Sequence, residues 1–312
     1  MNKYTTGETY RKARIDTATE LIPQNPAFKT FPGEKHCFDE REGHISFFSV
    51  MKAIESGVLT ELDKTMLSLV ATFGSACMTS KVLKELLTMM GVSYSANSFD
   101  SALKRLHKHQ LVNFSRFLLE NREPANTRII TLTNYGSQLA KSLGVYHRFN
   151  SFATASAEAH TVKSRAQTAH LISNYLKNRI ADGFEVRPVI VVDAENSKIV
   201  RPAASIKVLD EKIYFEVPRR HEGWLEDLLD KLHRYELVFD EKPAPTVIIN
   251  GEDEGMNREI AASIAKLNLP MEILYTDDLA MFGPKFRWSI YSFADDGTKQ
   301  CYELLAQEDA VA

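Results

Sequence analysis

The sequence predicts an α/β (α+β) protein with a helical domain followed by a mixed-sheet domain. Apolar residues recur at helical spacing through most of 60–110, and two β-prone runs follow them. After residue 184, short β-branched runs alternate with amphipathic segments. A chain of 312 residues, 44% of them apolar, is long enough to form two sizeable cores. The expected divisions are 1–59, an N-terminal arm and helix; 60–150, the helical domain; 151–183, a linker helix; and 184–312, the mixed-sheet domain.

Two short elements are expected ahead of the helical domain. A helix over Tyr10–Leu21 would end before Pro23, within an arm that is either mobile or docked elsewhere. A second helix is expected over Ser46–Ser56. His36 and Cys37 match no standard metal site in number or spacing, so no metal is expected there.

Three helices open the helical domain. The first has an apolar stripe from Leu62 to Phe73 and stops at Gly74. Thr79 or Ser80 can cap the second, which ends at Gly91, and serines before Phe99 can cap a third over Asn97–Gln110.

Two β-prone runs come next, Leu111–Leu119 and Arg128–Leu132, with a polar stretch between them. Three helices and then a hairpin is the order of a winged helix-turn-helix domain, in which the last helix enters the major groove of DNA. Asn134 is expected to cap a further helix. The candidate DNA contacts are Ser95, Asn97, Ser98, Ser101, Lys104, Arg105 and Lys108 on the third helix, with Arg122 and Arg128 in the wing. The alternatives are that these cations form a solvated helix face, or that the domain docks a protein.

Charge is distributed unevenly along the chain, although the net charge is only -3. Residues 60–150 carry eleven basic and six acidic side chains, whereas 151–312 carry nineteen basic and twenty-seven acidic ones. A basic domain is what binding to phosphates requires. Cys37, Cys77 and Cys301 are odd in number and far apart, which favours free thiols in a reducing cytoplasm, and no apolar run is long enough to span a membrane.

The mixed-sheet domain begins after a long helix expected over Ser156–Ala181. An antiparallel meander of three strands is expected next, followed by helix, strand, helix and strand. The strands are expected over Val186–Val192, Ile199–Val208, Lys212–Val217, Thr246–Ile249 and Met271–Tyr275, the helices over Trp224–Val238 and Met256–Leu267, and a last strand over Phe286–Phe293. The acidic pair Asp277 and Asp278 is expected in a solvated turn.

This order is the layout of a restriction-endonuclease-like core. Its chemistry needs an aspartate on the second strand and an acidic residue near a lysine on the third, so that carboxylates hold a divalent metal. Here Ala203 follows Pro202 where the aspartate is expected, and Pro218 stands two residues after Glu216. We therefore expect no catalytic residues, no metal and no cofactor. An alternative is a metal-dependent nuclease that uses Glu185, Asp193 or Glu216.

Tyr214-Phe215-Glu216-Val217 and the later run Leu228–Tyr235 resemble the signature of the replication-relaxation family of plasmids and other mobile elements. The resemblance covers about 60–280. It implies a winged helix before an endonuclease-like domain, and an association with plasmid replication and DNA relaxation or mobilisation. Ala203 and Pro218 depart from the pattern of the family.

Glu216, Lys231 and Tyr235 would form a degenerate nuclease pocket. Glu216 lies on an apolar strand that faces the helix carrying Lys231, so we expect those two side chains to meet. The pairing is either structural or part of a pocket for a ligand, phosphate or partner.

The first hypothesis for function is a sequence-specific protein that binds double-stranded DNA of a plasmid, phage or integrative element. It would act as a transcriptional regulator or as an accessory factor in replication or transfer. The inactive second domain would serve for homodimerisation, sensing or docking of a replication or transfer protein. No membrane partner is expected, and the expected location is the cytoplasm.

Overall fold

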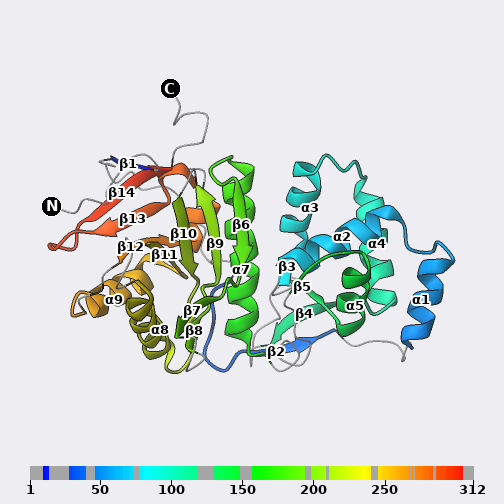
Figure 1. The fold of residues 1–312 in the computed structure, drawn as a ribbon, viewed down its shortest axis with the longest axis horizontal. Helices are drawn as coiled ribbons and strands as arrows, with labels where there is room; N and C mark the ends of the chain where they lie inside the picture. The colour runs from blue at the N-terminus through cyan, green and yellow to red at the C-terminus, as the bar shows by residue number, and fades with distance from the viewer. Residues whose placement is uncertain are drawn as a thin grey trace. The chain divides into compact units, whose positions relative to one another are not determined.

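The computed structural model describes residues 10–13, 28–39, 46–73, 77–118, 129–147, 157–193, 198–208, 211–239, 245–267, 269, 271–283 and 286–304. The chain forms two compact units, which are described separately (Figure 1). Unit 1 comprises Met1–Thr30 and Asn174–Ala312, and unit 2 comprises Phe31–Ser173. The protein is therefore a mixed α/β protein with two larger sheets, one in each unit.

Helices make up most of unit 2, and their bounds follow the caps in the sequence. They are α1 (Phe47–Glu55), α2 (Glu61–Thr72), α3 (Ser80–Met89), α4 (Ala96–Lys108), α5 (Asn134–Ser142) and the greater part of α7 (Ala159–Lys177). Thr60, Thr79 and Ser95 accept backbone N–H groups at the starts of α2, α3 and α4, which satisfies donors that a helix leaves free. Thr133, and not Asn134, caps α5.

A four-stranded antiparallel sheet completes unit 2, in the order β2-β4-β5-β3. Its strands are β2 (Lys35–Phe38), β3 (Cys77–Thr79), β4 (Val112–Leu118) and β5 (Ile129–Leu132). The hairpin expected from the sequence is confirmed, because β4 pairs with β5 in antiparallel register. Neither β2 nor β3 was predicted from the sequence. The tip of the hairpin lies outside the described residues.

Unit 1 is built on an eight-stranded mixed sheet in the order β1-β14-β13-β12-β11-β10-β9-β6. The strands are β1 (Tyr10–Ala13), β6 (Gly183–Val186), β9 (Ala204–Val208), β10 (Glu211–Glu216), β11 (Thr246–Gly251), β12 (Glu272–Asp277), β13 (Ile290–Phe293) and β14 (Lys299–Leu304). β10, β11 and β12 run parallel and the other pairs antiparallel. The carboxyl ends of three strands therefore meet at one edge.

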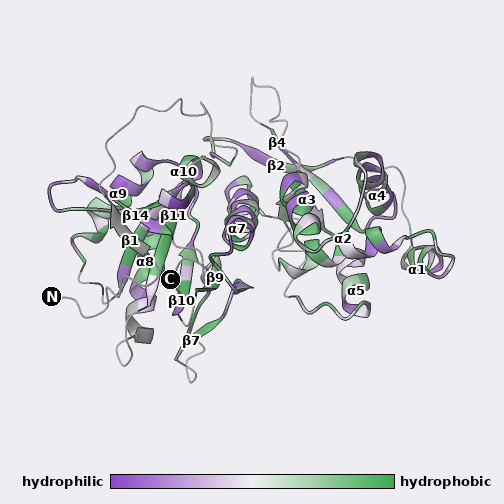
Figure 2. Cartoon of the chain, turned by 90° about the horizontal axis from the view of Figure 1, so that it is seen from above, coloured by the Kyte–Doolittle hydropathy of each residue, from purple (hydrophilic) through white to green (hydrophobic). Residues whose placement is uncertain are grey.

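Side chains of the central strands are buried on both faces of this sheet, whose strands are largely green in Figure 2. On one face, helices α8 (Trp224–Phe239) and α9 (Glu254–Ile264) cover Val247, Ile249 and Tyr275. The short α10 (Asp278–Phe282) and the 3-10 turn η1 (Phe286–Trp288) follow β12. A separate two-stranded hairpin, β7 (Ile190–Asp193) with β8 (Lys198–Val200), packs on α8.

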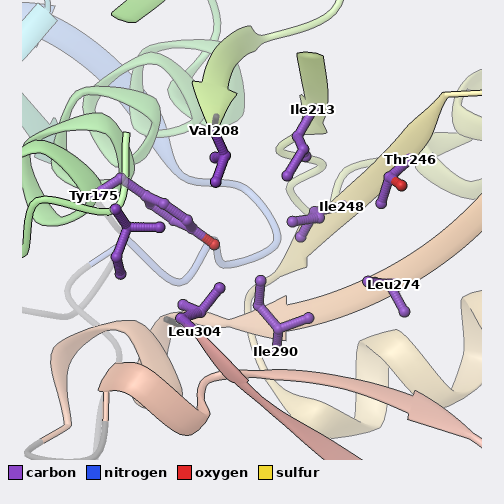
Figure 3. A pocket seen from close by; sticks show the side chains of 9 residues that line it. Tyr175, Val208, Ile213, Thr246, Ile248, Leu274, Ile290 and Leu304 are labelled. Carbon is purple, nitrogen blue, oxygen red and sulfur yellow. The ribbon is translucent and has the colours of Figure 1, made fainter. Parts of the chain in front are cut away.

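The other face of the sheet encloses a small apolar cavity of about 10 Å³. Figure 3 shows the hydroxyl end of Tyr175 directed among apolar side chains from several strands, including Val208, Ile248 and Ile290. This volume is near the lower limit for one water molecule. The cavity is therefore a packing gap and no ligand site.

Several expectations about unit 1 were wrong. The strand expected over Ile199–Val208 is broken at Pro202 into β8 and β9, so the meander is interrupted by the β7–β8 hairpin. Tyr10–Ala13 is a strand paired with β14, although a helix was expected there, and β14 follows the strand that was expected to be the last. Residues 10–13 thus form an edge strand of the sheet of unit 1. No helix in the described part of the chain combines the length and apolar composition needed to cross a bilayer.

Candidate functional site

The outer face of α4 carries four exposed polar side chains in one line. Asn97, Ser101, Lys104 and Lys108 are spaced at i, i+4, i+7 and i+11, which brings them to one side of a helix. Phe99, Ala102, Leu103 and Leu106 on the opposite side are buried. Much of α4 is accordingly hydrophilic in colour in Figure 2. Among the described residues, no hydrogen bond or ion pair engages the four polar side chains, so they are available to a partner.

Ser95 and Ser98 cap α4, as predicted for the serines before Phe99. Ser95 Oγ accepts the backbone N–H of Ser98 at 3.1 Å, and Ser98 Oγ accepts the N–H of Ser95 at 2.8 Å. This reciprocal pair is a capping box that fixes the start of α4. The structure therefore assigns both serines to the helix itself.

Arg105 also lies apart from the exposed line. Its Nε donates to Asp63 Oδ2 at 3.1 Å, and Asp63 is fully buried at the first turn of α2. The same carboxylate oxygen accepts the N–H and the hydroxyl of Thr60. Arg105 thus fastens α4 to α2, a contact between residues 42 positions apart. Arg105, a candidate DNA contact from the sequence, is therefore engaged within unit 2.

The proposed wing contacts, Arg122 and Arg128, lie outside the described residues. Near α4, His107 stacks on Phe114 of β4, and Lys84 lies 4.7 Å from the ring centre of Phe99. These contacts join α4 to β4 and to α3.

In unit 1, Glu216 ends β10 and is buried beneath α8. Lys231 Nζ donates to its Oε2 at 2.6 Å, and Tyr235 donates its hydroxyl to Oε1 at 2.7 Å. The contact expected between Glu216 and Lys231 is confirmed. Burial, together with the neighbouring Glu216 carboxylate, raises the pKa of Tyr235 well above its usual value, so its proton stays in this bond.

The other positions expected for nuclease chemistry are arranged differently. Ala203 donates its N–H to the carbonyl of Phe215 at 2.8 Å, so it lies beside the end of β10, where its methyl group can bind no metal. Glu185 accepts Lys212 Nζ at 2.5 Å near the surface, and the side chain of Asp193 is outside the described residues. Within the described ranges, no three His, Cys, Asp or Glu side chains are grouped as metal ligands.

The expectation that Asp277 and Asp278 are solvated was wrong, because both are buried at the carboxyl edge of the parallel strands. Arg219 Nη2 donates to Asp278 Oδ1 at 2.8 Å, and neither side chain has any exposed area. Burial raises the pKa of Asp278 to about 7, although the Arg219 cation opposes this shift. Asp277 Oδ2 accepts the hydroxyl of Tyr291 at 2.9 Å, and its pKa is likewise raised by burial.

Glu252 extends this buried cluster to the N-terminal segment. Its Oε1 accepts the backbone N–H groups of Thr30 at 3.2 Å and of Arg220 at 2.9 Å. Lys29 and Arg220 both lie 3.3 Å from Asp253 Oδ2. This cluster was not predicted from the sequence. Its only local signal is that acidic residues directly follow the buried strands β11 and β12.

Comparison with known proteins adds no family. No protein-family model matches the chain, and no curated protein matches it. Among solved structures, the chain is similar to the crystal structure of protein VC1899 from Vibrio cholerae, with 9% sequence identity and a TM-score of 0.30. The match covers 81% of this chain and 57% of that one, so the chain spans little more than half of that protein.

Proposed function

We propose that the chain is a sequence-specific double-stranded DNA-binding protein, with unit 2 as a winged helix-turn-helix domain and α4 as its recognition helix. The order α2-β3-α3-α4-β4-β5 and the antiparallel pairing of β3, β5 and β4 support this assignment. The observation that carries it is the line Asn97, Ser101, Lys104 and Lys108. Amide and hydroxyl groups can meet base edges or phosphates, and the lysines can meet phosphates.

Local charge agrees with this role. The α3–α4 segment, 80–108, has five basic and two acidic side chains, within a chain whose net charge is -3. With Arg105 committed to Asp63, the cations left for DNA on α4 are Lys104 and Lys108.

Unit 1 would then be a degenerate endonuclease-like module for homodimerisation, or for docking a replication or transfer protein. The strand order β6-β9-β10-β11, with α8 joining the parallel pair β10 and β11, supports this assignment. Glu216 is engaged by Lys231 and Tyr235, which supports a non-catalytic role. We further propose that the protein acts in the cytoplasm on DNA of a mobile element, as a regulator or an accessory factor.

The experiment is a salt titration of binding to DNA from around the gene of this protein, with a scrambled duplex of equal length as comparison. Lys104→Ala and Lys108→Ala should each weaken binding to both duplexes and reduce the log–log salt slope by about 1. Lys141→Ala is the matched control, because Lys141 is an exposed lysine on α5. Equal binding by all three variants, or no preference of the wild type for its own DNA, would overturn the proposal.

A further inference from the structure

A groove of about 430 Å³ lies between β8 and α8 in unit 1, and the proposed DNA-binding role leaves it unused. Six residues line it: Ile199, Val200, Arg201, Asp227, Lys231 and Arg234. The last three are spaced at i, i+4 and i+7 on α8, so they share one face of the helix. Val200 packs in one core with Leu228, Leu232 and Tyr235, and this packing fixes the β8 wall against the helix.

Cations dominate the polar lining of the groove. Three basic side chains stand against the single carboxylate of Asp227. Arg201 and Arg234 are exposed, and no hydrogen bond or ion pair within the described residues engages their guanidinium groups. Lys231 is oriented by its 2.6 Å bond to Glu216, while 30% of its side chain stays exposed. The groove therefore presents two guanidinium groups without an acceptor among the described residues, beside a lysine that Glu216 orients.

We propose that this groove binds a small phosphate-bearing ligand of nucleotide size. Arginine presents a planar set of donors that matches phosphate oxygens, and Lys231 adds a fixed positive charge. The half-buried Ile199 offers an apolar surface for a ring, and Asp227 offers an acceptor for a hydroxyl or amino group. The volume lies within the range of small-molecule sites, about 300–1,000 Å³.

The surrounding charge favours a small ligand over a nucleic-acid strand. Unit 1 carries twenty-nine acidic and twenty-two basic side chains, so a long polyanion on this unit would meet repulsion beyond the groove. A single phosphate group meets the three cations of the groove, whose lining has Asp227 as its one acidic residue. This site does not depend on α4, and the two proposals can fail separately.

Titration calorimetry on the full chain with adenosine monophosphate, inorganic phosphate and adenosine tests the proposal. We expect saturable binding of the monophosphate, weaker binding of phosphate and none of adenosine. The double variant Arg201→Ala/Arg234→Ala should lower the affinity for the monophosphate by about tenfold or more, since it removes charge-assisted hydrogen bonds. Lys266→Ala, an exposed cation after α9, is the control and should bind as the wild type does.

Three results would overturn the proposal. These are no saturable binding of either phosphate compound, equal affinities in the wild type and the double variant, and adenosine binding as tight as that of the monophosphate. Single-stranded DNA that binds more weakly in the double variant, without competition from the monophosphate, would assign these cations to nucleic acid instead. Both arginines are exposed, so the double variant should fold, and its circular dichroism spectrum would verify this.

Discussion

The outer face of α4 and the carboxyl edge of β10–β12 differ in whether their charged side chains are exposed or buried. On α4, Lys104 and Lys108 are exposed and unengaged by the described residues. At the sheet edge, Arg219 and Asp278 are completely buried against each other. A buried charge without its partner is far more costly than an exposed one. Substitutions at the sheet edge should therefore change stability, and substitutions on the α4 face should change binding.

The largest effect is expected at the buried pair. At about pH 8, above the raised pKa of Asp278, Arg219→Ala should lower the free energy of unfolding by about 3–5 kcal/mol, because the ionised Asp278 carboxylate is left buried without its cation. Urea denaturation followed by circular dichroism would measure it. The double substitution Arg219→Met/Asp278→Leu removes both charges and should recover most of the loss. A single variant as stable as the wild type would contradict the ion pair.

Arg105 tests whether pairing or position on α4 decides the effect of a substitution. It lies on α4, but it forms an ion pair with a buried carboxylate, as Arg219 does at the sheet edge. Arg105→Ala should lower the free energy of unfolding by about 1–3 kcal/mol, since it leaves the buried carboxylate of Asp63 with fewer donors. Lys104→Ala, one position earlier on the same helix, should leave stability unchanged and weaken DNA binding. Equal stability of the two variants would show that the Arg105–Asp63 contact contributes little.

The two units should also respond to pH in opposite directions. Burial lowers the pKa of His170 in unit 2 to about 3, from 6.5. Between pH 6.5 and pH 3, His170 is therefore protonated in the unfolded chain but neutral in the folded chain. Lowering the pH through this range destabilises unit 2. Burial raises the pKa of Asp278 in unit 1 from 3.8 to about 7, so its contribution to stability is lost as pH rises between those values.

Each group can change the free energy of unfolding by up to about 1.4 kcal/mol per pH unit. Urea denaturation at pH 5 and 6 would measure the slopes. Between pH 5 and 6, His170→Gln should reduce the increase in the free energy of unfolding of unit 2 that accompanies a rise in pH. Over the same range, Asp278→Asn should reduce the decrease in the free energy of unfolding of unit 1. An unchanged slope in the Asp278 variant would mean that Arg219 keeps this carboxyl ionised in the folded protein.

The sequence predicted the elements whose signals are local. The apolar stripe and Gly74 predicted α2, and the caps at Thr79 and Ser95 with their apolar stripes predicted α3 and α4, each to within one or two residues. The Glu216–Lys231 contact was also predictable, because alternation along β10 turns Glu216 towards α8. β2 and β3 were missed, because strands of three or four residues carry no pattern of their own.

The candidate sites were less predictable, because their contacts join distant residues. Nothing near Arg105 in the sequence indicates Asp63, and nothing near Asp278 indicates Arg219. Asp277 and Asp278 resemble a solvated acidic turn until the parallel register of β11 and β12 places them beside Tyr291 and Arg219. The sequence shows which residues are charged, but the register of the strands determines which of these side chains are exposed.

The smallest change in the free energy of unfolding is expected for substitution of Tyr175. This substitution tests whether its buried hydroxyl contributes a hydrogen bond. Its hydroxyl is buried beside the apolar cavity and has no hydrogen bond within the described residues. Tyr175→Phe should therefore leave the free energy of unfolding within about 1 kcal/mol of the wild type, or raise it. Tyr235→Phe is the control, because it removes a 2.7 Å bond to Glu216 and should cost about 1.5–3 kcal/mol. Urea denaturation compares the two, and equal losses would mean that a water molecule in the cavity satisfies the Tyr175 hydroxyl.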